Sequence, residues 1–406
     1  MIYDLIVIGS GAGGIMSAIT AGQNAKKVLL LEKLPTIASK LKATGGGKCN
    51  ITNTLSNEEF MSRFGKNGRF MQDALNSFDN NQLIEFLKSI GVDTHAPDGF
   101  RVFPTSHNSK TIISALEKKM QELNIELKCS QKVIQLLKED NTIVGVKTQD
   151  NRYKTKNVIL ATGGLGFSTL GAEGDGYKLS EEVGHKVTEL YPAMLPLHTK
   201  ERWVENCRAD TIAKVKIKVD MKKHKKLQAS GDLIFTKKGI RGPVVLDFAR
   251  EVTPLISKYG EVPIVINMTN GKNEDDLQNY LKTQKTDILD ALSMLIPTSL
   301  ALEICKLVDI KTDITFSKID GAKREKLLKI LAWTPLTLIG SDGFKMAMIT
   351  KGGISLKEIN PKTMQSKIIN GLYFCGEVID IDGPCGGYNL QWSFSSGYLA
   401  GLLKKG

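Results

Sequence analysis

The chain has 406 residues, of which 41% are hydrophobic and 24% charged, so it can bury a substantial core in two or three domains. This composition argues against a disordered or fibrous protein. No apolar run approaches the roughly 20 residues that cross a bilayer, and we therefore expect a cytoplasmic chain without a membrane partner. The six single cysteines form no C-x-x-C pair, so we expect neither a disulfide framework nor a metal site.

The first 33 residues are typical of a βαβ unit. The apolar runs 4–8 and 28–31 predict buried parallel strands, and the small residues 12–21 between them are compatible with a helix. The turn between the first strand and this helix matches the G-x-G-x-x-G motif of dinucleotide-binding folds. Its residues are Gly9, Ser10, Gly11, Ala12, Gly13 and Gly14.

This turn and the acidic residue that follows predict a bound dinucleotide. The first glycine permits the tight turn, the second lets the backbone approach a pyrophosphate, and the third lets helix and strand pack closely. The free N–H groups at the helix start then face the phosphates. Glu32 closes the second strand, where its carboxylate can accept a hydrogen bond from the adenosine ribose.

Three glycine-rich segments far apart in the chain favour FAD over NAD, because they indicate a long ligand that spans the fold. No second G-x-G-x-x-G turn is visible for a nicotinamide nucleotide, so we expect NAD(P)H only as a transient reductant. The residues expected to contact FAD in these segments are Lys40, Gly45, Gly46, Gly47, Cys49 and Asn50, then Thr162 and Gly163, and finally Gly376, Glu377 and Gly387.

The middle of the chain indicates a second lobe inserted into the nucleotide domain. Helices are expected over 80–90 and 110–123, followed by a β-meander that turns at 140–141 and 150–151 and ends in a strand over 158–161. Residues 193–340 then form the insertion, strand-like over 193–270 and helical over 271–335. The nucleotide domain thus comprises 1–192 and 341–406, and a last helix is expected from 388–389 onward.

The net charge of +12 is concentrated in the insertion, where residues 200–241 hold thirteen Lys or Arg and five Asp or Glu. Within it, lysines alternate with apolar residues over 214–219, the period of a half-buried strand with one solvated face. Two interpretations remain open. The face is an ordinary soluble edge, or it binds a polyanion such as a nucleic acid.

The sequence resembles the bacterial NAD(P)/FAD-dependent oxidoreductases of the BaiN-like type, also called the aminoacetone oxidase family. The motifs that carry the resemblance cover essentially the whole chain: the turn at 9–14, T-G-G-G-K-C-N at 44–50, R-V-F-P-T-S at 101–106, A-T-G-G at 161–164, G-D-G-Y at 174–177 and the run 371–401. A-T-G-G with G-D-G is also similar to the fumarate reductase and succinate dehydrogenase flavoproteins.

The resemblance implies an α/β fold, with a Rossmann-like FAD-binding domain of two or three layers and an inserted lobe of β-barrel and helices. It implies FAD contacts at Ala12, Glu32, Lys33, Val133, Glu377, Asn389 and Leu390. It also implies hydride exchange between flavin and a carbon–carbon bond beside a carbonyl. Two departures from the family pattern, Cys375 and Arg241, put the substrate pocket in question.

Four residues are candidates for the catalytic role, because the flavin carries the redox step and the protein supplies orientation and a proton donor. Arg101 can hold a carbonyl or pair on the surface, and His107 can donate a proton or face solvent. Arg241 stands at one of the departures from the family pattern. Cys385 lies in a glycine loop, where a free cysteine acts either as a redox thiol or as a small apolar residue.

Three functions compete at this stage. The first is a flavin enzyme acting on a small organic substrate, with reduction of a double bond conjugated to a carbonyl as the expected reaction. The second is a flavin-dependent RNA-modifying enzyme or RNA-binding flavoprotein, suggested by the lysines over 214–226. The third is a redox-silent FAD-binding sensor.

Overall fold

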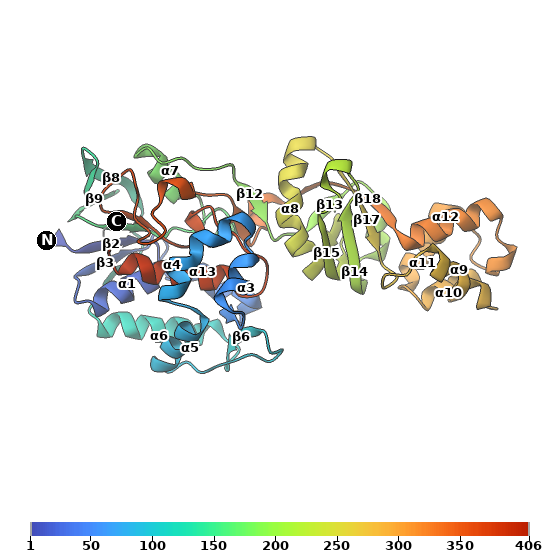
Figure 1. Ribbon diagram of the computed structural model, residues 1–406, viewed down its shortest axis with the longest axis horizontal. Helices are drawn as coiled ribbons and strands as arrows, with labels where there is room; N and C mark the ends of the chain where they lie inside the picture. Colours follow the sequence, from blue (N-terminus) through green and yellow to red (C-terminus); the bar gives the residue numbers. More distant parts are fainter. Residues whose placement is uncertain (1, 405–406) are drawn as a thin grey trace. The chain divides into compact units, whose positions relative to one another are not determined.

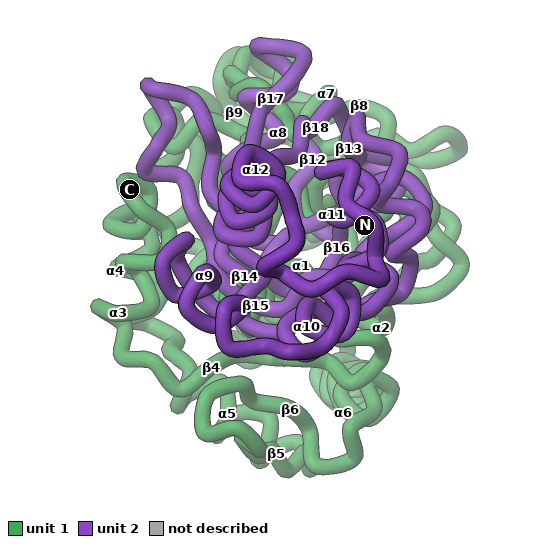
Figure 2. Tube along the Cα trace, turned by 90° about the vertical axis from the view of Figure 1, so that its right-hand side faces the viewer, with its two compact units in different colours: residues 1–191, 349–406 green, residues 192–348 purple. Residues whose placement is uncertain are grey.

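A computed structural model describes residues 2–404 and divides the chain into two compact units (Figures 1 and 2). Unit 1 comprises residues 1–191 and 349–406, and unit 2 comprises residues 192–348. The chain therefore leaves unit 1, builds unit 2 and returns. The short strands β12 (Tyr191–Ala193) and β19 (Ile349–Lys351) carry it across the two junctions.

A five-stranded parallel sheet forms the centre of unit 1. Its strand order is β20-β11-β2-β3-β7, and every neighbouring pair is parallel. Four of the strands are buried along their whole length, as expected when both faces of a sheet are covered. The strands are β2 (Leu5–Ile8), β3 (Val28–Leu31), β7 (Glu126–Lys128), β11 (Val158–Leu160) and β20 (Leu372–Phe374).

The two faces of the parallel sheet are covered differently. Helix α1 (Ala12–Gln23) packs against β2 and β3 and also contacts α6 (Ser109–Glu122) and α13 (Tyr388–Gly401). The second sheet of unit 1 has the order β1-β10-β9-β8, and in Figure 1 the parallel sheet lies between it and α1. Its strands are β1 (Ile2–Tyr3), β8 (Val133–Glu139), β9 (Thr142–Thr148) and β10 (Arg152–Thr155).

The expected meander is correct in its turns and wrong in its last strand. Antiparallel pairing of β8 with β9 and of β9 with β10 confirms the turns at 140–141 and 150–151. Strand β11, in contrast, leaves the meander and pairs in parallel with β2 and β20. Its three residues are all buried, which suits the interior of a parallel sheet.

The remaining elements of unit 1 lie at the edges of these layers. The helices expected over 80–90 and 110–123 are present as α5 (Asn80–Ser89) and α6. A small antiparallel sheet joins β4 (Thr52–Asn53), β6 (Arg101–Pro104) and β5 (Thr94–His95). The other helices are α2 (Ser39–Ala43), α3 (Asn57–Ser62), α4 (Gln72–Ser77) and α7 (Asp175–Glu182).

Unit 2 is a closed six-stranded barrel with helices, as the fold class predicted. The strand order is β13-β16-β15-β14-β17-β18, and apolar residues of alternating positions fill the interior. The strands are β13 (Leu197–Thr199), β14 (Thr211–Val219), β15 (Gln228–Phe235), β16 (Gly239–Arg241), β17 (Val262–Asn267) and β18 (Thr334–Ser341). The helices of the second half are α9 (Glu274–Thr283), α10 (Ile288–Ser293), α11 (Thr298–Val308) and α12 (Gly321–Ala332).

Two features of unit 2 differ from the expected division into strands and then helices. Helix α8 (Pro243–Tyr259) interrupts the strand-like part, and it buries Val244, Phe248 and Val252 at helical spacing. Strand β18 follows the helices and closes the barrel between β17 and β13. The barrel therefore needs residues from both sides of the helical segment, which composition alone does not reveal.

Two absences concern the part of the chain that the structure describes. Within residues 2–404, no helix combines the length and apolarity needed to span a membrane. Over the same range, no group of His, Cys, Asp and Glu side chains has the arrangement of a metal site.

Candidate functional site

The glycine turn before α1 holds space for a ligand. A Cβ on Gly14 would lie 1.9 Å from the carbonyl oxygen of Gly9, and a Cβ on Gly9 (φ +99°) would lie 2.6 Å from that of Ala161. Packing therefore demands both glycines. A Cβ on Gly11 would meet nothing within 4 Å, so this glycine faces open space. No side chain caps α1 at Gly11, which leaves the N–H groups of Ala12 and Gly13 available to an anion.

Glu32 is tied to this turn by hydrogen bonds. Its Oε2 accepts from the Ser10 backbone N–H (2.9 Å) and from the Ser10 hydroxyl (2.5 Å), and its Oε1 accepts from the Leu34 N–H (2.9 Å). The side chain is buried at the carboxyl end of β3. The carboxylate thus fixes the start of the phosphate turn and keeps an acceptor position for a ribose hydroxyl.

Lys33 lies in an ion-pair cluster beside Glu32. Its Nζ is 2.9 Å from Glu173 Oε2 and 2.5 Å from Asp175 Oδ2, and Lys132 is 3.0 Å from Asp175. Burial would raise the pKa of Asp175, but its hydrogen bonds with Lys33 and Lys132 outweigh this and lower it. The cluster holds α7 against the strand end that carries Glu32. Val133, another predicted contact, is the buried first residue of β8.

The loop 44–50 combines strained backbone with open space. Gly45, Gly46 and Gly47 all have positive φ, and a Cβ on Gly46 or Gly47 would meet nothing within 4 Å. Cys49 is fully buried, and burial raises the pKa of its thiol to about 11. A thiol of that pKa stays protonated near neutral pH and does not act as a thiolate.

Asn50 connects the loop to the start of the last helix. In its preferred amide orientation, its oxygen accepts from the Gly387 N–H (3.0 Å) and its nitrogen donates to the Thr52 carbonyl (3.0 Å). Gly387 has φ +83°, and a Cβ there would lie 2.4 Å from the Thr52 carbonyl. Helix α13 begins at Tyr388, as expected, and no side chain caps it. The positive end of its helix dipole therefore lies at the glycine loop 383–387.

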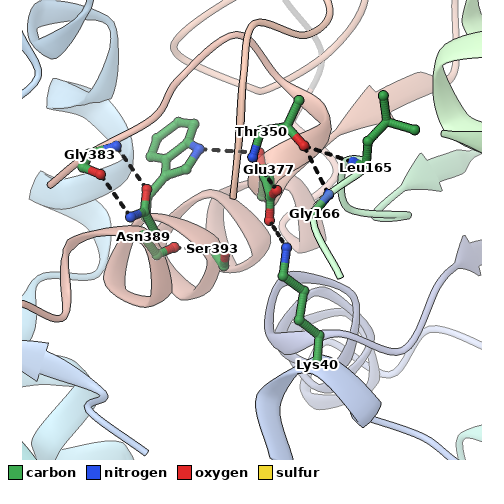
Figure 3. A network of polar contacts seen from close by, with 10 residues as sticks. Lys40, Leu165, Gly166, Thr350, Glu377, Gly383, Asn389 and Ser393 are labelled. Atoms are coloured by element: carbon green, nitrogen blue, oxygen red, sulfur yellow. Dashed lines mark hydrogen bonds and ion pairs between the residues drawn. The ribbon is translucent and has the colours of Figure 1, made fainter. Parts of the chain in front are cut away.

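The first turn of α13 is held to the loop before it. The Asn389 side chain accepts from the Gly383 N–H (2.8 Å) and donates to the Gly383 carbonyl (3.0 Å), as Figure 3 shows. Leu390 follows it and is half-buried. Close backbone contact fixes the rest of the helix, because a Cβ on Gly397 would lie 2.3 Å from the Gly13 carbonyl in α1. The two helices with uncapped amino ends thus form one rigid pair.

A polar network around Glu377 joins four segments of unit 1 (Figure 3). Lys40 Nζ lies 2.5 Å from Glu377 Oε2, and the Thr350 N–H donates to Glu377 Oε1 (2.9 Å). The Thr350 hydroxyl oxygen accepts from the backbone N–H groups of Leu165 (2.7 Å) and Gly166 (3.2 Å). The predicted contacts Lys40 and Glu377 are therefore partners of each other.

Two buried hydroxyls lie beside this network. Thr162 Oγ1, directly after β11, has no hydrogen-bond partner among the described residues. The Tyr177 hydroxyl in α7 interacts with the side chain of Thr350. Burial, followed by the negative charge of Glu377, raises the pKa of Tyr177. A Cβ on Gly163 would meet only open space. Buried polar groups usually have partners, so the Thr162 hydroxyl indicates a polar ligand, and the ribityl hydroxyls of FAD fit that chemistry.

Three of the four catalytic candidates lie in unit 1 and one lies in unit 2. Arg101 is exposed on β6 and forms an ion pair with Asp98 (2.6 Å), whose pKa it lowers to about 2. His107 packs edge-on against the His95 ring, with ring centroids 4.6 Å apart. Cys385 is exposed in the loop before α13. Arg241 ends β16 in unit 2, whereas the other three candidates belong to unit 1.

Sequence reasoning missed Thr350 and Tyr177 as site residues. Tyr177 belongs to the G-D-G-Y motif, so a signal for it was present. Thr350 follows an ordinary apolar residue on the return from unit 2, and only the fold brings it to Glu377. The predicted FAD contacts otherwise lie at the ends of the parallel strands and the starts of α1 and α13, and they remain predictions.

Together, the parallel sheet, the glycine turn and the second uncapped helix define a flavoprotein with a Rossmann-type FAD-binding domain. The chain matches the family model of the HI0933-like protein Rossmann domain over residues 3–403 and belongs to that family. This confirms the resemblance to BaiN-like flavoproteins. The chain is an FAD-dependent oxidoreductase.

Two relatives are similar along almost their whole length. The 3-dehydro-bile acid delta(4,6)-reductase of Clostridium scindens is 27% identical over 402 residues, which cover 97% of each chain. The Ribosomal RNA dihydrouridine synthase of Escherichia coli is 27% identical over 401 residues, covering 98% of this chain and 96% of that protein.

Among solved structures, the fold is similar to that of the 3-ketosteroid delta1-dehydrogenase of Sterolibacterium denitrificans. The TM-score is 0.54 at 12% sequence identity, and the match covers 98% of each chain. At this identity the likeness shows the shared fold alone.

Proposed function

We propose that the chain reduces a carbon–carbon double bond conjugated to a carbonyl, with NAD(P)H as the source of electrons. The observation that carries this proposal is the pair of helix starts in unit 1, the uncapped start of α1 after Gly11 and the positive dipole end of α13 after Gly387. The first suits the pyrophosphate of FAD. The second suits a ring that becomes negatively charged, which is what the reduced flavin of a hydride donor does.

Bound FAD supplies the hydride, and the residues of this chain bind it and tune its charge. Gly11 would admit the pyrophosphate, Glu32 would accept a hydrogen bond from the ribose, and the unpartnered hydroxyl of Thr162 would meet the ribityl chain. The positive dipole end of α13 would face the region where negative charge develops, and the Asn50–Gly387 hydrogen bond holds that turn in place.

The two full-length relatives support this reaction type. A delta(4,6)-reductase acts on ring double bonds in a 3-dehydro, hence 3-keto, bile acid. Dihydrouridine is uridine whose ring double bond next to a carbonyl has been reduced. Different as these substrates are, both reactions reduce a double bond that a carbonyl polarises.

NAD(P)H is proposed as a transient reductant because the sequence carries one G-x-G-x-x-G turn, at residues 9–14, which FAD occupies. A nicotinamide nucleotide would then bind briefly, reduce the flavin and leave before the substrate enters.

The test is a pair of half-reactions on the FAD-loaded protein. Anaerobic addition of NADH or NADPH should bleach the flavin spectrum, and an enone should then restore it faster than a matched saturated ketone. Reoxidation by oxygen or an α-amino ketone, with no response to the enone, would contradict the proposal. A flavin that neither nucleotide reduces would favour a redox-silent sensor.

The same experiment sorts the catalytic candidates. Arg101→Gln, His107→Gln, Arg241→Gln and Cys385→Ser should be compared at matched flavin content. Replacing the residue that donates the proton should slow the reaction with the enone and leave the reduction of the flavin by NADPH unchanged.

A second substrate class, uracil within RNA, is favoured by one observation. Lys214 and Lys216 of β14 are exposed, Lys218 is half-buried, and none of the three has an ion-pair partner in the described part of the chain.

A further inference from the structure

We propose that the face of unit 2 formed by β14 and the turn after it is a docking surface for the phosphate backbone of RNA. We call it the lysine face, and its residues are Lys214, Lys216, Lys218, Lys222, Lys223, Lys225 and Lys226. The inference rests on the proposed function, because it implies that the reduced double bond belongs to a nucleobase.

Among the described residues, the lysines of the lysine face form no ion pairs, whereas several other lysines of unit 2 do. Lys306, Lys323 and Lys329 each pair with a carboxylate at 2.5 to 2.7 Å. Lys200, Lys237 and Lys238 have acidic partners as well. No ion pair within residues 2–404 involves any of the seven lysines of the lysine face. Their charge is therefore left for an external anion.

The strand geometry places these charges in a row. Val215, Ile217 and Val219 point into the barrel and are buried, so Lys216 and Lys218 share its outer face. Successive outward residues on a strand stand about 6.6 Å apart. Opposite them on β15, Gln228 and Ser230 are exposed and uncharged.

Acidic residues hardly interrupt this row. Across residues 211–226, Asp220 is the single acid against seven lysines. On the neighbouring strand β15, Asp232 accepts a hydrogen bond from the backbone N–H of Lys214 rather than from its ammonium group. A cation row of this kind matches a polymer that carries one negative charge per repeat.

An aromatic ring lies within the row. The Lys218 ammonium sits 3.7 Å from the ring centroid of Trp333, at the end of α12. The contact fixes the direction of one charge, and the half-buried indole adds a flat apolar surface of the kind on which nucleobases stack. Cations beside an aromatic ring are typical of proteins that bind nucleic acids.

RNA suits this face better than a lipid membrane. Peripheral membrane binding combines basic residues with apolar side chains that enter the lipid. No exposed large hydrophobic residue among the described residues of unit 2 belongs to β14 or the turn after it. Tyr259 lies beside that turn, with its ring centroid 6.0 Å from that of His224, and an exposed aromatic ring is also a surface on which nucleobases stack.

The test measures RNA binding by the oxidised, FAD-loaded protein, so it does not depend on turnover. The probe is a short fluorescein-labelled single-stranded RNA, followed by anisotropy from about 50 to 200 mM salt. The test variant carries Lys216→Gln, Lys222→Gln and Lys223→Gln. The matched control carries Lys306→Gln, Lys323→Gln and Lys329→Gln, which remove the same charge from ion-paired lysines in the same unit.

The test variant should bind RNA at least about tenfold more weakly, and the slope of log K against log salt should become about 2 smaller, because three phosphate contacts are lost. The control variant should bind like the wild type. Equal losses in both variants, or none in either, would overturn the proposal. So would stronger binding to phosphatidylserine vesicles than to the RNA.

Failure of this inference is distinguishable from failure of the proposed function. Enone reduction with intact flavin but no RNA binding would refute only the lysine face. RNA binding that the test variant loses, in a protein whose reduced flavin ignores every double bond, would refute only the reductase assignment.

Discussion

Replacing Glu32 with alanine should weaken FAD binding without changing the spectrum of the flavin that stays bound. The carboxylate lies at the end of β3, beside the phosphate turn, and the predicted partner is the adenosine ribose, far from the isoalloxazine ring. The variant therefore separates retention of the cofactor from its electronic properties.

The hydrogen bonds of Glu32 limit the size of the effect. An ionised carboxylate offers about four acceptor positions, and the protein occupies three of them through Ser10 and Leu34. One position remains for a ribose hydroxyl. A hydrogen bond to a charged group contributes about 1.5–3 kcal/mol, so the Kd for FAD should rise about 10- to 150-fold. Loosening of the Ser10 turn would add to this value.

Flavin release on dialysis and titration of the apoprotein with FAD measure the effect. Glu303→Ala is the matched control, because Glu303 is a buried carboxylate in α11 of unit 2 with its own ion pair to Lys306. It should lower the melting temperature and leave the Kd for FAD unchanged. Equal FAD affinity in wild type and Glu32→Ala would refute the role given to this residue.

The other predictions concern the helix start, one buried histidine and the two units. Gly387→Val should lower the flavin reduction potential by about 10–40 mV, because it displaces the helix start whose dipole stabilises the reduced flavin. Ser395→Ala, measured at the same flavin occupancy, should leave the potential unchanged. A reductive titration of both variants measures the difference. Burial lowers the pKa of His185, against the opposing effect of Glu358. The unfolded chain therefore binds this proton more readily, so thermal stability should fall below about pH 6.5, and less so in His185→Gln. Deletion of residues 192–348 with a short linker should leave an inactive domain that still takes up FAD; a folded product without flavin affinity would contradict this.

Local rules are sufficient to predict much of unit 1 from the sequence. The turn at 9–14 is recognisable because Gly9 and Gly14 are required by packing and Gly11 by ligand access. The start of α13 is recognisable for a similar reason, since Gly387 adopts a positive φ directly before a largely buried helix.

Long-range contacts explain what the sequence could not predict. Strand β11 follows a meander along the chain, yet its place between β2 and β20 depends on β20, which lies more than 200 residues later. The barrel likewise closes only through β18, after four helices. Thr350 reaches Glu377 through the same return of the chain, so no local motif marks it.

The most direct test of the central claim is the single turnover of reduced, FAD-loaded protein with a conjugated enone in the absence of oxygen. The flavin absorbance should recover with one equivalent of enone, and the product should carry two additional hydrogens at the former double bond. The matched saturated ketone should give no recovery. Recovery with the saturated ketone, or a reduced flavin that persists in the presence of both the enone and a uridine-containing RNA, would contradict the account.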